Sequence, residues 1–218
     1  MKEAENSWKK FLHPETLRGN LLAISLFVAA FEKFKDCVVE KPQTFFRHEF
    51  DKEGLIISER YKTKVLSKAK SPLYASLLWF KEMGAIDDSD IQSFEEIKSH
   101  RNEVIHELMD FLADADRNFD PAKFKALVDL FGKIEKWWLV NIEMAIDPDF
   151  LPDGATPEDV IPGVLMSLQL MLDIALGNEP QEGYYYNALK EKIESSTSPS
   201  HHSDMMAKQA GIALVDEE

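Results

Sequence analysis

Apolar side chains recur along most of this chain at the three- and four-residue spacing of an α-helix, and strand-like alternation is nearly absent. The pattern predicts an all-α fold, an up-and-down bundle of five to six helices. Its longest apolar stretch predicts a helix over about 14–40, with Pro14 in the first turn and Pro42 beyond the end. The apolar residues of that stretch cover more than one stripe, as in a central, well-buried helix. They are Leu21, Leu22, Ile24, Leu26, Phe27, Val28, Phe31 and Phe34.

Start and stop signals predict the other helices. Ser71 and Asp120 are typical N-caps, each followed by proline, and Gly84 and Gly177 are typical of helix ends. The expected ranges are about 55–68, 71–84, 87–114, 120–147 and 157–176, with a short amphipathic helix over 184–196.

The domain prediction is a single helical domain over 1–194 and a tail over 195–218 that is too polar to pack a core and is expected to be disordered. The longest uncharged runs, 19–31 and 160–172, are shorter than the roughly 20 residues that cross a bilayer, so no membrane partner is expected. Cys37 is the single cysteine, which excludes an internal disulfide and a cysteine metal cluster. A cytoplasmic location is expected, without a cofactor or metal.

The net charge of −14 comes from 39 acidic and 25 basic side chains, and such a surface repels nucleic acid unless cations gather locally. One segment, 60–81, contains no acid. Its cations are candidates for RNA binding, although a solvated helix face is the more common cause of such a run. The candidates are Arg60, Lys62, Lys64, Lys68 and Lys70.

The stretch SHRNEVIHEL, residues 99–108, places unusual side chains in the helix predicted over 87–114. At 100° per residue, Arg101 lies about 40° from Ile97 and therefore inside the apolar stripe. Asn102 and His106 lie on another face at about 140° and 180°, one turn apart. Because unpaired burial of a guanidinium is costly, Arg101 must pair with an acid, bind an anion or lie at an interface. His100 is expected at the surface.

Two interpretations of Arg101 stay open at this point. In the first, it pairs with a carboxylate of a neighbouring helix and has a structural role. In the second, it binds a phosphate, Asn102 holds a hydroxyl or phosphate oxygen, and His106 transfers a proton near neutral pH. Those three groups would suffice to cleave RNA, in a reaction in which its 2′-hydroxyl attacks the adjacent phosphate.

The sequence Arg101-Asn102-x-x-x-His106 resembles the R-(polar)-x-x-x-H signature of the HEPN superfamily, and the helix order over 14–146 is similar to that of its helical bundle. The resemblance implies a metal-independent endoribonuclease of toxin–antitoxin or phage-defence systems, with Arg101, Asn102 and His106 as its catalytic residues. It also implies a homodimer that shares the site across its interface, and an antitoxin-like protein partner. Leu108 stands where many toxin members carry a tyrosine.

Two other functions remain open from the sequence. One is a non-catalytic interaction or regulatory protein, antitoxin-like or a scaffold, whose acidic surface engages a basic partner. The other is a nucleotide-binding module, because some HEPN proteins bind nucleotides without cleaving RNA.

Overall fold

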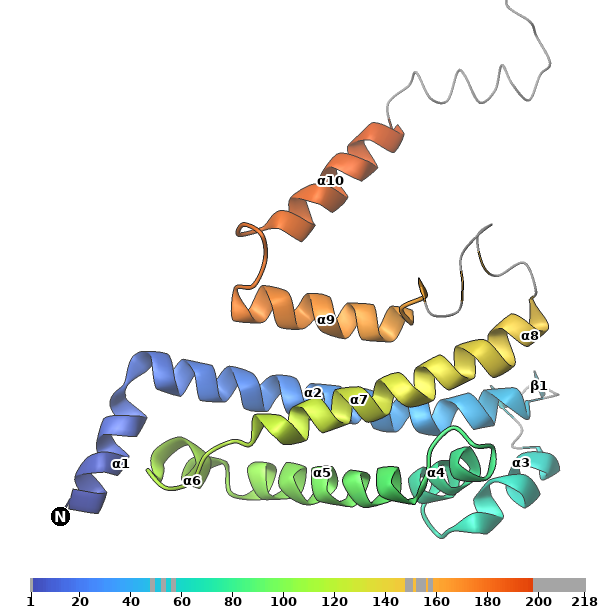
Figure 1. Ribbon diagram of the computed structural model, residues 1–218, viewed down its shortest axis with the longest axis horizontal. Coiled ribbons are helices and arrows are strands. Elements are labelled where there is room, and N and C mark those ends of the chain that lie inside the picture. The colour runs from blue at the N-terminus through green and yellow to red at the C-terminus, as the bar shows by residue number, and fades with distance from the viewer. Residues whose placement is uncertain are drawn as a thin grey trace, which may run out of the picture. The chain divides into compact units, whose positions relative to one another are not determined.

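The computed structural model describes residues 2–47, 50–51, 54–55, 58–147, 151, 156 and 159–197. These residues are almost entirely helical, which confirms the predicted all-α class (Figure 1). The chain divides into two compact units, 1–168 and 169–218, so the boundary falls inside the range predicted as one domain. Residues 198–218 of the predicted tail lie outside the described residues.

The first unit is built on three long helices packed lengthwise (Figure 1). The helix α5 runs antiparallel to α2 and α7 and contacts both. Phenylalanines fill the space between them, with ring centroids of Phe34 5.5 Å from Phe131 and 5.9 Å from Phe94. The helices of this unit are α1 (Lys2–Leu12), α2 (Pro14–Phe45), α3 (Glu59–Lys64), the 3₁₀ turn η1 (Leu66–Lys68), α4 (Pro72–Glu82), α5 (Asp88–His106), α6 (Leu108–Ala113), α7 (Pro121–Trp138), the π-helical turn η2 (Leu139–Glu143) and α8 (Met144–Ile146).

The end of α2 differs from the prediction, because the helix continues through Pro42 to Phe45. A proline ring inside a helix removes one backbone hydrogen bond, so another interaction has to support the last turn. Tertiary packing supplies it: Pro42 is buried, and the Phe45 ring centroid lies 6.2 Å from that of Trp79 and 6.1 Å from that of Trp138. These aromatic contacts come from α4 and α7, which local sequence does not reveal.

The helix predicted over 55–68 is wrong in its first part. The strands β1 (Phe50–Asp51) and β2 (Gly54–Leu55) pair as an antiparallel hairpin, and helix begins only at Glu59, where the Ser58 hydroxyl accepts the N–H of Tyr61. Val65, with φ and ψ of −115° and −66°, ends α3, and η1 follows it as a separate turn.

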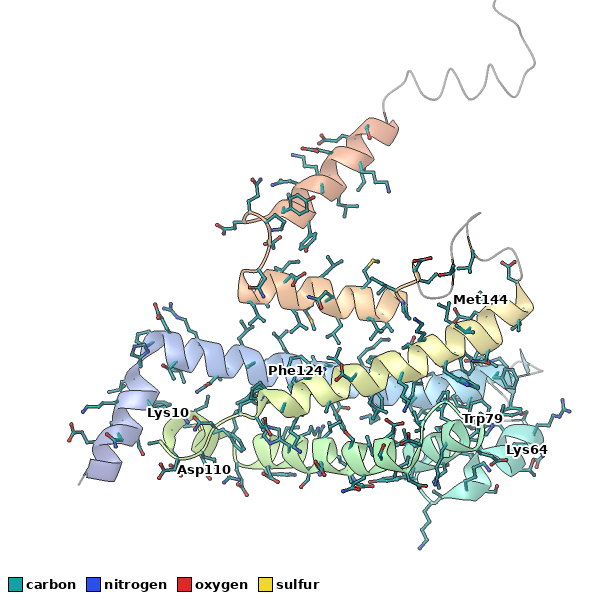
Figure 2. All side chains as sticks on the ribbon, viewed as in Figure 1. Lys10, Lys64, Trp79, Asp110, Phe124 and Met144 are labelled. Carbon is teal, nitrogen blue, oxygen red and sulfur yellow. The ribbon has the colours of Figure 1, made fainter. Side chains whose placement is uncertain are left out.

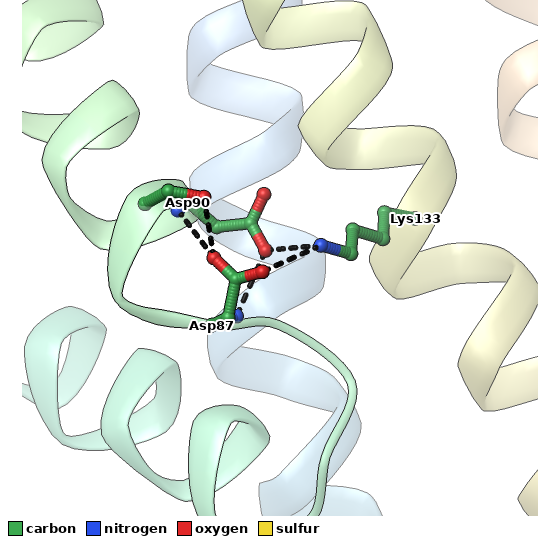
Figure 3. A network of polar contacts seen from close by, with 4 residues as sticks. Asp87, Asp90 and Lys133 are labelled. Atoms are coloured by element: carbon green, nitrogen blue, oxygen red, sulfur yellow. Dashed lines mark hydrogen bonds and ion pairs between the residues drawn. The ribbon is translucent and has the colours of Figure 1, made fainter.

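A capping box starts α5 (Figure 3). The Asp87 carboxylate accepts the backbone N–H of Asp90 at 3.0 Å, and the Asp90 carboxylate accepts that of Asp87 at 2.8 Å. Hydrogen bonds from Ser89 and the Asp90 backbone lower the pKa of Asp87 to about 2. Lys133 of α7 pairs with both carboxylates, so the cap also ties α5 to α7.

The helix predicted over 87–114 is interrupted at Glu107, whose φ and ψ of −123° and 30° end α5 at His106. After this bend, α6 carries Phe111 and Leu112 into a core cluster with Ile24 and Val104. The N-terminal helix α1, which the periodicity did not predict, packs against α2 and α6. Lys10 of α1 donates to the carbonyl oxygens of Asp114 at 2.7 Å and Arg117 at 2.5 Å, which satisfies backbone acceptors beyond the end of α6.

A charged cluster joins α2 to α7 and η2, and Glu135 is its buried member. Lys41 Nζ lies 3.2 Å from Glu135 Oε2 and 3.9 Å from a carboxylate oxygen of Glu143, and it stands 5.0 Å from the Trp138 ring centroid. Glu135 is 5% exposed, and its Oε1 has no hydrogen-bond partner among the residues that the structure describes. Burial, opposed by Lys41, raises the pKa of Glu135.

The remaining described helices are α9 (Gly163–Leu176), shorter than the predicted 157–176, and α10 (Tyr184–Thr197). Within the second unit, the Tyr185 hydroxyl donates to Asp173 at 3.1 Å. Among the described residues, no helix has both the length and the apolar character that crossing a bilayer requires.

Candidate functional site

Arg101 lies on the face of α5 that also carries the fully buried Ile97 and Val104, where the helical spacing predicts it. Its guanidinium carbon stands 5.3 Å from the ring centroid of Phe31 on α2. One terminal nitrogen, Nη2, pairs with Glu32 Oε1, and the side chain keeps 24% of its surface exposed. Arg101 is therefore an arginine at the edge of the core, anchored on α2 and open to solvent.

The Glu32 carboxylate is shared by two cations. Arg101 contacts Oε1, and Lys35, one turn further along α2, contacts Oε2. The hydrogen bond from Lys35, supported by Arg101, lowers the pKa of Glu32 even though burial opposes the shift. These three side chains together carry one net positive charge, in a protein that is strongly acidic as a whole.

Asn102 is joined to Arg101, because its Oδ1 accepts a hydrogen bond from Arg101 Nη1 at 3.3 Å. These contacts leave one N–H on each terminal nitrogen of the guanidinium for another acceptor. The structure thus brings together Arg101, Asn102, Glu32 and Lys35. The sequence predicted the first two and missed the others, because a Glu-x-x-Lys pair on a helix is a common surface feature.

His106 is the last residue of α5 and is exposed. It lies five positions beyond Arg101 along the helix, about 7.5 Å along the axis and about 140° around it. Within one chain, the guanidinium and the imidazole therefore point in different directions. A site that uses both needs a group from elsewhere, such as a second copy of the chain.

His100 is buried, so its expected surface position is wrong. Its Nε2 accepts the backbone N–H of Asp120 at 3.3 Å, and its ring lies 5.4 to 5.8 Å from those of Phe27, Phe111 and Phe119. Burial lowers the pKa of His100 and favours the neutral ring that can accept this bond. His100 is a structural residue, whereas the imidazole of His106 is accessible from solvent.

The candidate RNA-binding cations lie far from Arg101. They sit on α3, η1 and the turn that follows, at one end of the bundle, whereas His106 and α6 lie at the other end (Figures 1 and 2, where Lys64 and Asp110 mark the two ends). Lys62 pairs with Glu59 at 2.6 Å, and Lys68 pairs with Glu82. Arg60, Lys64 and Lys70 are exposed.

Exposed apolar side chains stand on both sides of His106, at the end of α5 and the start of α6. Ile105 is 39% exposed and Met109 is 60% exposed, on either side of His106 in the sequence. Met109 also lines a groove of about 320 Å³ between α1 and α6, where Trp8 is 62% exposed. The groove is lined by Ala4, Ser7, Trp8, Phe11, Met109 and Ala113.

No protein-family model matches this chain, and comparison with curated proteins and with solved structures finds no match. Within the described part of the chain, no three histidine, cysteine or acidic side chains gather as a metal site would need. The geometry around Arg101 is therefore the feature of the described residues that bears on function.

Proposed function

We propose that the protein is a HEPN-like, metal-independent endoribonuclease whose site is centred on Arg101, Asn102 and His106. The observation that carries this proposal is the net positive charge of the Lys35, Glu32 and Arg101 cluster, together with the unused N–H groups of an oriented guanidinium. Such a group can hold a phosphodiester and stabilise the charge that develops on it during cleavage.

Catalysis in this proposal requires two copies of the chain. The exposed apolar side chains of Ile105 and Met109 would lie in the interface of a homodimer and place His106 of one copy beside Arg101 of the other. His106 would then remove the 2′-hydroxyl proton or protonate the leaving oxygen, while Arg101 holds the phosphate. A cytoplasmic role in phage defence, with a protein partner that restrains the nuclease, fits this activity.

The test is cleavage of RNA in the presence of EDTA. Wild-type protein is expected to cleave, and Arg101→Ala and His106→Ala are each expected to lower the rate by about 10²-fold or more. Arg18→Ala is the matched control, because Arg18 is an exposed arginine on α2 outside the site. Failure of the wild type to cleave, or equal rates for wild type and Arg101→Ala, would reject the proposal.

A second function, a non-catalytic interaction or regulatory protein, is favoured by the ion pair between Arg101 and Glu32. If this contact only joins α2 to α5, Arg101→Ala should lower the thermal midpoint and His106→Ala should leave it unchanged. Thermal unfolding of both variants, measured beside the cleavage assay, separates the two functions. A folded Arg101→Ala variant without activity supports the nuclease.

A further inference from the structure

We propose that Lys35 is a second phosphate-binding residue of this site and that Glu32 positions both cations. The inference rests on the proposed function in that it takes RNA as the ligand. It adds two residues of α2 to a site that the sequence places entirely on α5.

The carboxylate of Glu32 sets the spacing of the two cations. Each of its oxygens takes one partner, so the ammonium of Lys35 and the guanidinium of Arg101 are held a few ångströms apart. The side chains of Lys35, Glu32 and Arg101 are 40%, 35% and 24% exposed, so a ligand can reach all three. Consecutive phosphates of a single strand could engage such a pair of cations.

The structural role of the pair between Lys35 and Glu32 is small. It is a half-exposed pair three residues apart on one helix, and such pairs contribute little to stability. Removing Lys35 should therefore leave the fold intact while taking one cation from the RNA. Loss of one contact between a cation and a phosphate lowers the slope of log affinity against log salt. This slope therefore reports the role of Lys35 in binding separately from any effect on folding.

Glu32 should show opposite effects on binding and on cleavage. Glu32→Gln removes the negative charge between the two cations, which favours binding of a polyanion. It also leaves one acceptor oxygen and no negative charge where two cations were paired, so the guanidinium of Arg101 is held less firmly and the chemical step slows. If Glu32 had only a structural role, Glu32→Gln would lower the thermal midpoint and would not tighten RNA binding.

The experiment measures binding of the full chain to a labelled single-stranded oligonucleotide made of 2′-O-methyl RNA, titrated at several salt concentrations. This probe lacks the attacking hydroxyl, so binding can be measured whether or not the protein is a nuclease. Lys35→Gln is expected to weaken binding about three-fold or more and to reduce the slope of log affinity against log salt by about one. The control is Lys33→Gln, which changes the same charge at an exposed position of the same helix.

Glu32→Gln is expected to bind the probe more tightly than wild type and, with cleavable RNA, to show a lower kcat. Equal affinities and slopes for Lys35→Gln and Lys33→Gln would overturn the inference, as would absence of binding by the wild type. Binding that depends on Lys35 without any cleavage of normal RNA would reject the proposed nuclease and leave the anion site standing. If Glu32→Gln fails to fold, the two lysine variants decide the question.

Discussion

Individual buried polar side chains should determine how this bundle responds to pH. His100 accepts the N–H of Asp120, the cap of α7, and it can do so only while its Nε2 is unprotonated. Because its pKa is lowered by burial, the unfolded chain binds more protons than the folded one between that lowered pKa and the ordinary value near 6.5. The contribution of His100 to stability is therefore complete above about pH 6.5 and decreases as the pH falls below it.

We predict that His100→Gln flattens the change in unfolding free energy between pH 7 and pH 5. The glutamine amide oxygen can still accept a hydrogen bond, but it does not titrate. Urea unfolding at several pH values measures the slope, with His106→Gln at an exposed position as the control. An unchanged slope in His100→Gln would show that other groups cause the pH dependence in this range.

Lys41 provides a second prediction at the residue scale. Lys41→Met leaves the buried Glu135 without its cation, and breaking a buried pair in this way costs about 3–5 kcal/mol. The pKa of Glu135 is already raised by burial, so acid should relieve part of the cost by neutralising the carboxyl. The loss of stability in Lys41→Met should be larger at pH 8 than at pH 5, in urea unfolding.

The double variant Lys41→Met/Glu135→Gln removes both charges and is the matched comparison. It should recover stability relative to Lys41→Met at pH 8, because no charge remains buried. A double variant that is no more stable than Lys41→Met would show that the lysine stem, packed on Trp138, is what matters.

At the scale of elements, Lys10 should stabilise the packing of α1 against the bundle. Its ammonium donates to two carbonyl oxygens beyond the end of α6, and hydrogen bonds that involve a charged group contribute about 1.5–3 kcal/mol when partly shielded. We predict that Lys10→Met speeds amide exchange in both α1 and α6 and leaves α5 and α7 unchanged. Hydrogen–deuterium exchange with mass spectrometry reports these helices separately, and Lys9→Met, at an exposed position, is the control.

An element can be predicted from the sequence when the interactions that form it join residues close together in the chain. The beginnings of α2, α4, α5 and α7 were predictable, because Pro14, Pro72, Asp87 and Asp120 act within one turn of themselves. The bend at Glu107 could not be predicted from local sequence, because it accompanies the packing of α6 against Ile24, which is far away in the sequence.

At the scale of the whole molecule, the proposed homodimer can be tested at Met109, an exposed apolar side chain next to His106 in the proposed interface. Met109→Glu places a charge on a side chain that is 60% exposed, so the folded chain should tolerate it. In a dimer interface the same charge would be desolvated without a partner, which should dissociate the dimer and abolish a shared active site. Sedimentation velocity of wild type and variant measures the effect, and a wild type that is monomeric at all concentrations would contradict the proposed dimer.

The sequence by itself determined the all-α class, the starts of the long helices, and the requirement that an arginine in an apolar stripe find a partner. It did so because periodicity and capping act between residues a few positions apart. Only the tertiary structure decided that the partner is Glu32 and that Lys35 shares it. Those outcomes depend on which helices pack side by side, and Glu32 and Arg101 meet across 69 positions of sequence.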